Sequence, residues 1–265
     1  MSNLIHSTAI VSPNAKIGEN VKIGPYTIIE DDVEIGTGTE IMYSVIIANG
    51  ARIGKNCRIF SHVAIATEPQ DIKYAGEVTY AIIGDNTVIR EFATINRATT
   101  ATYRTEVGNN CLIMTYAHVA HDCKIGNNVR ITNSVQLGGH VEVEDNAIIG
   151  GSSVVHQFCK VGRNIMIGGA VKITKDVPPF VMIGENPPKV DGLNLIGMRR
   201  GGYSDDAIKA IQEFYNTLFR SGLNNSDGLA KYKSEHSVIM PEVQLCIDFI
   251  EIKSNRGIYR MQDKK

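Results

Sequence analysis

The stretch Ala15-Lys16-Ile17-Gly18-Glu19-Asn20-Val21-Lys22-Ile23-Gly24 contains a six-residue pattern that decides the fold. An aliphatic residue recurs at every sixth position from Ile5 to Ile173, except at three positions. The residue two places earlier is usually small or β-branched, and glycine often follows the aliphatic one. Residues two apart point to the same side of a strand, and glycine tolerates the dihedral angles of corners. The pattern therefore predicts a three-sided prism of short parallel strands, with 18 residues in each lap.

The three exceptions mark two predicted departures from the prism. Asp71 and Glu77 occupy aliphatic positions, which predicts a loop near residues 66–82, and Ala101 lies in a second loop near residues 97–106. Each loop is either a tolerated surface insertion or a segment that reaches a ligand or a neighbouring subunit, because long ordered loops are often functional.

The prism pattern ends near Pro178, and helical signals follow. Ser204 is a suitable helix N-cap with two acidic residues behind it, and a second helix is expected near Pro241. We therefore predict a mainly β protein with a prism over residues 1–189 and a small helical domain over residues 190–265.

The bulk composition excludes several classes of protein. The 265 residues include 27 basic and 28 acidic side chains, which argues against a general nucleic-acid or membrane-surface binder. The N-terminal stretch has no signal-peptide pattern, and no apolar run is long enough for an integral membrane segment. The five cysteines form no C-x-x-C pair, which favours the reducing cytoplasm. Four of them occupy the small inward position and are expected to be buried filler: Cys57, Cys111, Cys123 and Cys159.

The 18-residue lap places chemically useful residues on top of one another. His121 is expected to stack on Gly139 and Asp122 on His140, at a corner outside the prism. A neutral imidazole can take a proton from a hydroxyl, and a carboxylate can orient the ring. A glycine N–H can approach a developing oxyanion. These residues predict acyl transfer with His121 as base, Asp122 as its partner and Gly139 as oxyanion donor. No serine or cysteine is placed as a nucleophile, which favours direct attack by the acceptor.

The hexads resemble the hexapeptide-repeat family, whose fold is a left-handed parallel β-helix, and the left hand is taken from that resemblance. Four further motifs are more specific: Gln70-Asp71-Ile72-Lys73-Tyr74-Ala75-Gly76-Glu77, Ala117-His118-Val119-Ala120-His121-Asp122-Cys123, Val155-His156-Gln157-Phe158-Cys159, and the Asn194 to Arg200 stretch. Together they resemble the acyl-carrier-protein–UDP-N-acetylglucosamine O-acyltransferases, which catalyse the first step of lipid A biosynthesis.

The resemblance implies a homotrimer that moves a 3-hydroxyacyl group from the phosphopantetheine of acyl carrier protein to the 3-hydroxyl of UDP-N-acetylglucosamine, with no cofactor and no metal. It assigns sugar-nucleotide or acyl-cleft contacts to Asp71, Lys73, His118, His140, His156 and Gln157. It also assigns nucleotide-end contacts to Asn194 and to Arg200, which would meet phosphate. Ile196 and Gly201 depart from residues common in that family, so the nucleotide-end contacts stay open.

Other functions remain open at this stage. A coenzyme-A-dependent acetyltransferase has the same fold, and a non-catalytic scaffold would leave the His/Asp cluster unexplained. A zinc hydratase of the hexapeptide-repeat type would use three histidines, but its pattern has a pair five apart, whereas His118 and His121 are three apart. The helical domain either caps the open strand edges of the prism or docks the acidic acyl carrier protein, and both can hold. The sequence gives neither the acyl chain length nor the choice between a 3-hydroxyl and a 3-amino acceptor.

Overall fold

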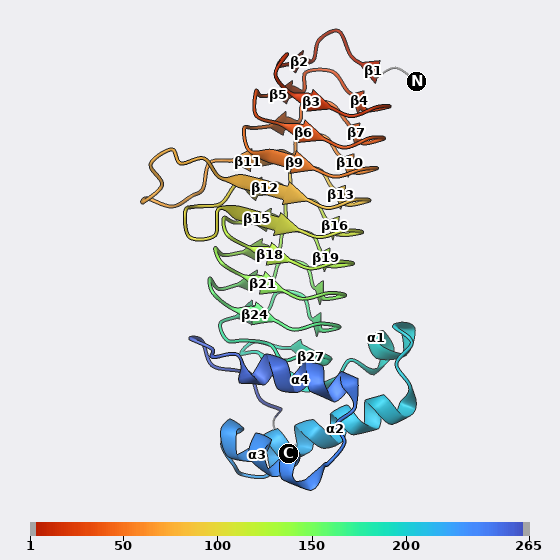
Figure 1. Ribbon diagram of the computed structural model, residues 1–265, viewed down its shortest axis with the longest axis vertical. Coiled ribbons are helices and arrows are strands. Elements are labelled where there is room, and N and C mark those ends of the chain that lie inside the picture. The colour runs from red at the N-terminus through yellow and green to blue at the C-terminus, as the bar shows by residue number, and fades with distance from the viewer. Residues whose placement is uncertain (1–3, 262–265) are drawn as a thin grey trace.

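The computed structural model describes residues 4–261, so the outer ends of the two expected domains, at residues 1–3 and 262–265, lie outside the described residues. Laps of short strands stack into a column, and four helices gather at its C-terminal end within this described range (Figure 1). The architecture is the expected left-handed parallel β-helix with a small helical part: the hexads predict the laps, and the family resemblance predicts the left hand.

Three sheets form the faces of the β-helix, and their strands are parallel except for the last strand of the first sheet. The first contains β1 (Leu4–Ile5), β4 (Lys22–Ile23), β7 (Glu40–Ile41), β10 (Arg58–Ile59), β13 (Val88–Ile89), β16 (Leu112–Ile113), β19 (Arg130–Ile131), β22 (Ile148–Ile149), β25 (Met166–Ile167), β27 (Val181–Gly184) and β28 (Lys189–Leu193). The second contains β2 (Ile10–Val11), β5 (Ile28–Ile29), β8 (Ile46–Ile47), β11 (Ala64–Thr67), β14 (Thr94–Asn96), β17 (His118–Val119), β20 (Gln136–Leu137), β23 (Val154–Val155) and β26 (Lys172–Ile173). The third contains β3 (Lys16–Ile17), β6 (Glu34–Ile35), β9 (Ala51–Ile53), β12 (Tyr80–Ile83), β15 (Arg104–Val107), β18 (Lys124–Ile125), β21 (Glu142–Val143) and β24 (Lys160–Val161).

The register confirms the predicted lap. His118 pairs with Gln136 and Val119 with Leu137, 18 residues apart. The recurring aliphatic residues fill the interior, where Ile113, Ile131 and Ile149 are fully buried. Burial of these side chains contributes roughly 1.5–3 kcal/mol each relative to exposure. The four cysteines expected as filler are likewise buried and free.

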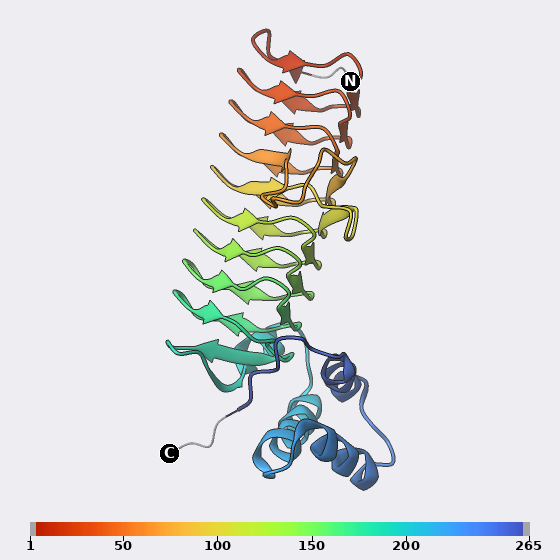
Figure 2. The ribbon, with the colours of Figure 1, turned by 90° about the vertical axis from the view of Figure 1, so that its left-hand side faces the viewer.

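The two interruptions are loops on the same side of the column (Figures 1 and 2). The first spans residues 68–79 between β11 and β12, and the second spans residues 97–103 between β14 and β15. Arg97 fastens one to the other, since its Nη2 lies 2.7 Å from the hydroxyl oxygen of Tyr74 and its Nη1 lies 2.9 Å from the carbonyl oxygen of Ala66.

The helices are α1 (Leu195–Arg200), α2 (Asp205–Arg220), α3 (Asn225–Glu235) and α4 (Pro241–Glu251). The two helices expected from the sequence are α2, which Ser204 caps through the N–H of Ala207, and α4. The Tyr215 hydroxyl donates to the carbonyl of Pro179 at 2.8 Å and joins α2 to the end of the β-helix. The expected boundary after residue 189 falls at the start of β28, which pairs with β27 through Leu193.

Within residues 4–261, no helix is long and apolar enough to cross a lipid bilayer.

Candidate active site

His121 and Asp122 occupy the corner between β17 and β18. The His121 Nδ1 lies 2.7 Å from Asp122 Oδ2, and the side chains are 12% and 0% exposed. Asp122 has a φ of 60°, in the left-handed region that an L-residue seldom adopts, and its N–H donates to the Thr105 hydroxyl at 2.8 Å. The same φ recurs at equivalent corners such as His140 and Asn146, so the turn belongs to the repeat, and here it leaves the carboxylate beside the ring of the preceding residue.

Further donors surround the Asp122 carboxylate. The hydroxyl and N–H of both Thr99 and Thr102 donate to it, from the second loop. Burial raises the pKa of Asp122, but the hydrogen bonds from His121, Thr102 and Thr99 outweigh burial and hold this pKa well below 3.8. Because the carboxylate is ionised, it can only accept, so His121 Nδ1 carries a proton, and in the neutral form of the ring Nε2 has the lone pair.

Gly139 lies against the His121 ring, as the 18-residue lap predicts. A Cβ atom on Gly139 would lie 2.6 Å from His121 Cε1 and 2.7 Å from Nε2, so any side chain here would displace the ring. Among the described residues, no acceptor takes the Gly139 N–H. The site therefore places an available backbone donor beside the ring edge that carries Nε2.

His140 is the second wall of this corner. Its ring meets His121 edge-on at a centroid distance of 5.3 Å and stacks on Phe158 at 4.4 Å. Burial lowers the pKa of His140, as does His121, while Asp122 and Asp71 oppose this effect. His140 is thus held neutral more readily than a free histidine, and Asp71 of the first loop lies near enough to act on it.

His118 faces outward from β17 one step before the corner. Its Nδ1 lies 2.7 Å from the Thr94 hydroxyl oxygen on the preceding lap. Burial lowers the pKa of His118, and the neighbouring His121 adds to this effect. Both flanking histidines can therefore serve as neutral polar groups near the dyad.

The other expected contact residues lie further from the dyad or are engaged elsewhere. His156 and Gln157 are exposed at the equivalent corner one lap after His140, and Lys73 is exposed in the first loop. Asn194 is buried, caps α1 through the N–H of Gly197 and donates to the Asn164 carbonyl. Arg200 is exposed at the end of α1. One chain thus brings together His118, His121, Asp122, Gly139 and His140. Helix α1, which Asn194 caps and Arg200 ends, lies apart from them at the C-terminal end of the column (Figure 1).

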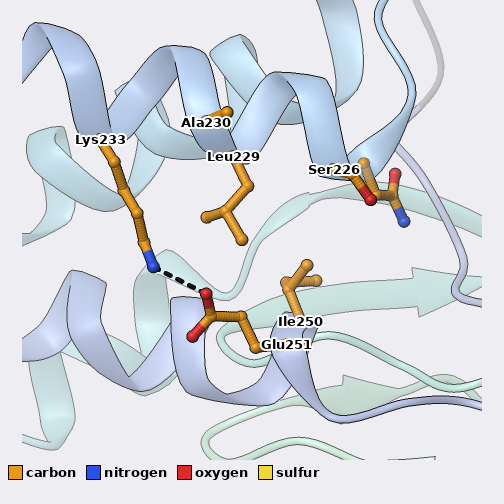
Figure 3. A pocket seen from close by; sticks show the side chains of 7 residues that line it. Ser226, Leu229, Ala230, Lys233, Ile250 and Glu251 are labelled. Carbon is orange, nitrogen blue, oxygen red and sulfur yellow. Dashed lines mark hydrogen bonds and ion pairs between the residues drawn. The ribbon is translucent and has the colours of Figure 1, made fainter.

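A hollow of about 470 Å³ opens beside this corner. It runs from Thr102, Asp122 and His140 past Phe158 to the C-terminal segment at Ser254. A separate hollow of about 430 Å³ lies between α3 and α4, where Lys233 and Glu251 form an ion pair of 2.7 Å (Figure 3). Only the first hollow reaches the dyad.

The sequence patterns missed four residues of this site. Phe158 lies 18 residues after His140, so the lap length itself could have indicated the stacking. Thr99 and Thr102 lie in a loop outside the repeat, where spacing carries no information on contacts. Arg256 returns from the C-terminal segment, and its Nε donates to the Gln157 carbonyl at 3.0 Å.

The same atoms allow a metal site to be tested. Single ligand atoms of His121, Asp122 and His140 all lie within 4.8 Å of one another. However, both oxygens of Asp122 already accept hydrogen bonds from protein donors. A cation here would have to displace them, so the geometry fits a hydrogen-bonded dyad better than a metal centre.

Comparisons with known proteins agree with this geometry. Residues 14–48 and 104–139 match the bacterial transferase hexapeptide model, and residues 176–259 match the second domain of UDP-N-acetylglucosamine O-acyltransferase. A curated acyl-[acyl-carrier-protein]–UDP-N-acetylglucosamine O-acyltransferase from Thermodesulfovibrio yellowstonii is 47% identical, covering 97% of this chain and 100% of its own. The LpxA structure from Acinetobacter baumannii is 44% identical, with a TM-score of 0.93 over 97% of this chain and 100% of its own. The UDP-N-acetylglucosamine acyltransferase structure from Francisella novicida is 38% identical, with a TM-score of 0.92 over 98% of this chain and 95% of its own.

The β-helix and the corner dyad define a hexapeptide-repeat acyltransferase. With these identities over nearly the full length, the chain belongs to the family of acyl-[acyl-carrier-protein]–UDP-N-acetylglucosamine O-acyltransferases, and it is an O-acyltransferase.

Proposed function

We propose that the protein transfers a 3-hydroxyacyl group from acyl carrier protein to the 3-hydroxyl of UDP-N-acetylglucosamine, the first step of lipid A biosynthesis, with His121 as general base. The observation that carries this proposal is the buried His121–Asp122 pair, whose ring edge faces Gly139. The names of the relatives supply the two substrates.

The chemistry follows from the three residues. Nε2 of His121 takes the proton of the sugar 3-hydroxyl while its oxygen attacks the thioester carbonyl carbon. Asp122 stabilises the imidazolium that forms, and the Gly139 N–H donates to the tetrahedral oxyanion. The intermediate collapses, the C–S bond breaks, and the proton on Nε2 passes to the departing thiolate of phosphopantetheine. No covalent acyl-enzyme and no cofactor are needed.

The flanking residues bind and orient the substrates in this proposal. His118 and His140 have lowered pKa values, so near neutral pH they offer hydrogen bonds without adding charge. Asp71, Lys73, His156 and Gln157 contact the sugar nucleotide or the acyl chain in this proposal. Arg200 meets phosphate. Asn194 makes its contact only if it leaves its cap on α1 or presents atoms not used there.

We further propose a homotrimer, which would bring residues of a neighbouring subunit to each site. The outer face of the second sheet supports this, because it exposes Ile10, Ile28, Ile46 and Val154. The third sheet instead carries ion pairs such as Lys16–Glu34 on its outer face. Ile10, Ile28 and Ile46 are consecutive in the ladder and form an exposed apolar patch on the first laps, which supports a protein–protein contact there.

The helical domain has two proposed roles. It closes the last lap of the β-helix, and its basic residues dock acyl carrier protein. Two of the basic residues on its surface, Lys231 and Lys233, face glutamates at 3.9 and 2.7 Å, which leaves Arg200 and Arg220 as the freer candidates.

We take the domain boundary after Leu193, where β28 ends. The five free, buried cysteines support the cytoplasmic location.

A transfer assay with UDP-N-acetylglucosamine and 3-hydroxyacyl carrier proteins of several chain lengths tests the proposal. We expect ester product with one preferred length. Transfer from acetyl-coenzyme A alone would instead identify a coenzyme-A-dependent acetyltransferase. Activity that depends on added zinc and is lost on chelation would favour a metal site at His121, Asp122 and His140.

A further inference from the structure

The second loop, residues 97–103, reaches back to the dyad. It leaves the repeat after β14, and two of its three threonines, Thr99 and Thr102, surround the carboxylate of Asp122 on the following lap. The Thr99 hydroxyl donates to Oδ2 at 2.8 Å, the same oxygen that accepts from His121 Nδ1. The Thr102 hydroxyl donates to Oδ1. A loop outside the hexad pattern therefore supplies hydrogen bonds that the repeat itself does not.

Backbone groups complete this arrangement. The N–H of Thr99 lies 3.3 Å from Oδ1 and 3.2 Å from Oδ2, and the N–H of Thr102 lies 3.2 Å from Oδ1. With donors on both oxygens, rotation of the carboxylate would break several bonds at once. The Asp122 side chain is 0% exposed, so its oxygens depend on protein donors.

We propose that Thr99 and Thr102 are positioning residues for acyl transfer, which hold Asp122 so that Oδ2 stays aligned with His121 Nδ1. The inference rests on the proposed function, because it gives the threonines a role only through His121. If Oδ2 were misaligned, the imidazole could rotate or change its tautomer. Its Nε2 would then leave its position beside Gly139. In this proposal the threonines act through Asp122 and not through a contact with either substrate.

The chain offers matched substitutions for the test. Thr99→Val and Thr102→Val remove the hydroxyls at nearly constant volume, whereas Thr99→Ser and Thr102→Ser retain them. Thr100→Val is the control within the loop, since its exposed side chain makes no hydrogen bond to Asp122 among the described residues. Thr39→Val is the control for loss of a buried hydroxyl, because Thr39 donates to the Gly54 carbonyl several laps from the dyad.

We expect each valine variant to lower kcat about tenfold, the effect of losing one hydrogen bond to a charged group, with both KM values within about threefold. The serine variants and both controls should stay within about threefold of wild type by the same measure. In a His121→Ala background the valine substitutions should add no further loss, because residues that act as one unit are non-additive.

The outcomes separate the positioning role from the proposed base. Wild-type kcat in both valine variants, with activity lost in His121→Ala, would refute the positioning role alone. Equal losses in the serine and valine variants, or full additivity with His121→Ala, would show a structural effect and refute it as well. Wild-type activity in His121→Ala would overturn the proposed base and this inference together. If Thr99→Val fails to fold by circular dichroism, Thr102→Val and Thr102→Ser, at an exposed residue, test the same role by the same comparisons.

Discussion

Replacing Gly139 by alanine tests the contact on which the site depends. The new methyl carbon would lie 2.6 Å from His121 Cε1, whereas ordinary contact begins at about 3.4 Å, so the ring must move by about 0.8 Å. Gly139 is not in the left-handed φ region, so alanine does not strain the backbone there. A displacement of about 1 Å at a catalytic group costs roughly 100-fold in rate. We therefore expect kcat to fall about 100-fold while the fold persists.

The assay is steady-state transfer to UDP-N-acetylglucosamine, with thermal unfolding measured on the same samples. Gly168→Ala is the matched control, because its methyl group would lie at an ordinary 3.5 Å from Gly184 Cα. Turnover of Gly139→Ala within threefold of wild type, with an unshifted unfolding midpoint, would refute the close contact between Gly139 and the reactive ring edge.

Two further predictions concern stability and assembly. Asp122→Asn should lower the free energy of unfolding by about 2 kcal/mol or more near neutral pH, since it replaces a buried carboxylate that accepts several hydrogen bonds. The folded-state pKa of Asp122 lies below its ordinary 3.8, so the ionised group stabilises the fold above that value and this contribution is lost as the pH falls. In urea unfolding, the free energy of unfolding of wild type should exceed that of Asp122→Asn by an amount that is constant above about pH 5 and decreases below about pH 4. A difference that does not change with pH would contradict the lowered pKa of Asp122. Ile46→Asp, on the exposed apolar face of the second sheet, should dissociate the assembly by placing a charge in a desolvated contact, whereas Glu34→Asp on the charged third sheet should not. Sedimentation equilibrium gives the masses, and an unchanged trimer in Ile46→Asp would place the subunit contact elsewhere.

The repeat made much of the fold predictable, because the hexad states which side chain points inward at every position. The pairing of His118 with Gln136 follows from that period alone, and so does the contact of His121 with Gly139. Helices α2 and α4 were predictable from a cap and from an apolar spacing. The short α1 and the polar α3 have weaker periodic signals, and neither was predicted.

The unpredicted parts of the site come from segments without a period. Thr99 and Thr102 bond to Asp122 across a loop whose path depends on Arg97 and Tyr74. Arg256 reaches Gln157 from 99 residues away, after the chain has passed through the helical domain. Contacts of this kind are set by tertiary packing, which no local spacing in the sequence encodes.

The most direct test of the proposed mechanism is the transfer rate of His121→Ala beside wild type, measured in single turnovers so that product release does not limit it. Because His121→Ala removes the general base, we expect the single-turnover rate to fall about 100- to 10,000-fold. The proposed trimer and the binding of UDP-N-acetylglucosamine should persist, because His121 is not part of the β-helix core. A single-turnover rate within a few-fold of wild type would contradict the assignment of His121 as the base.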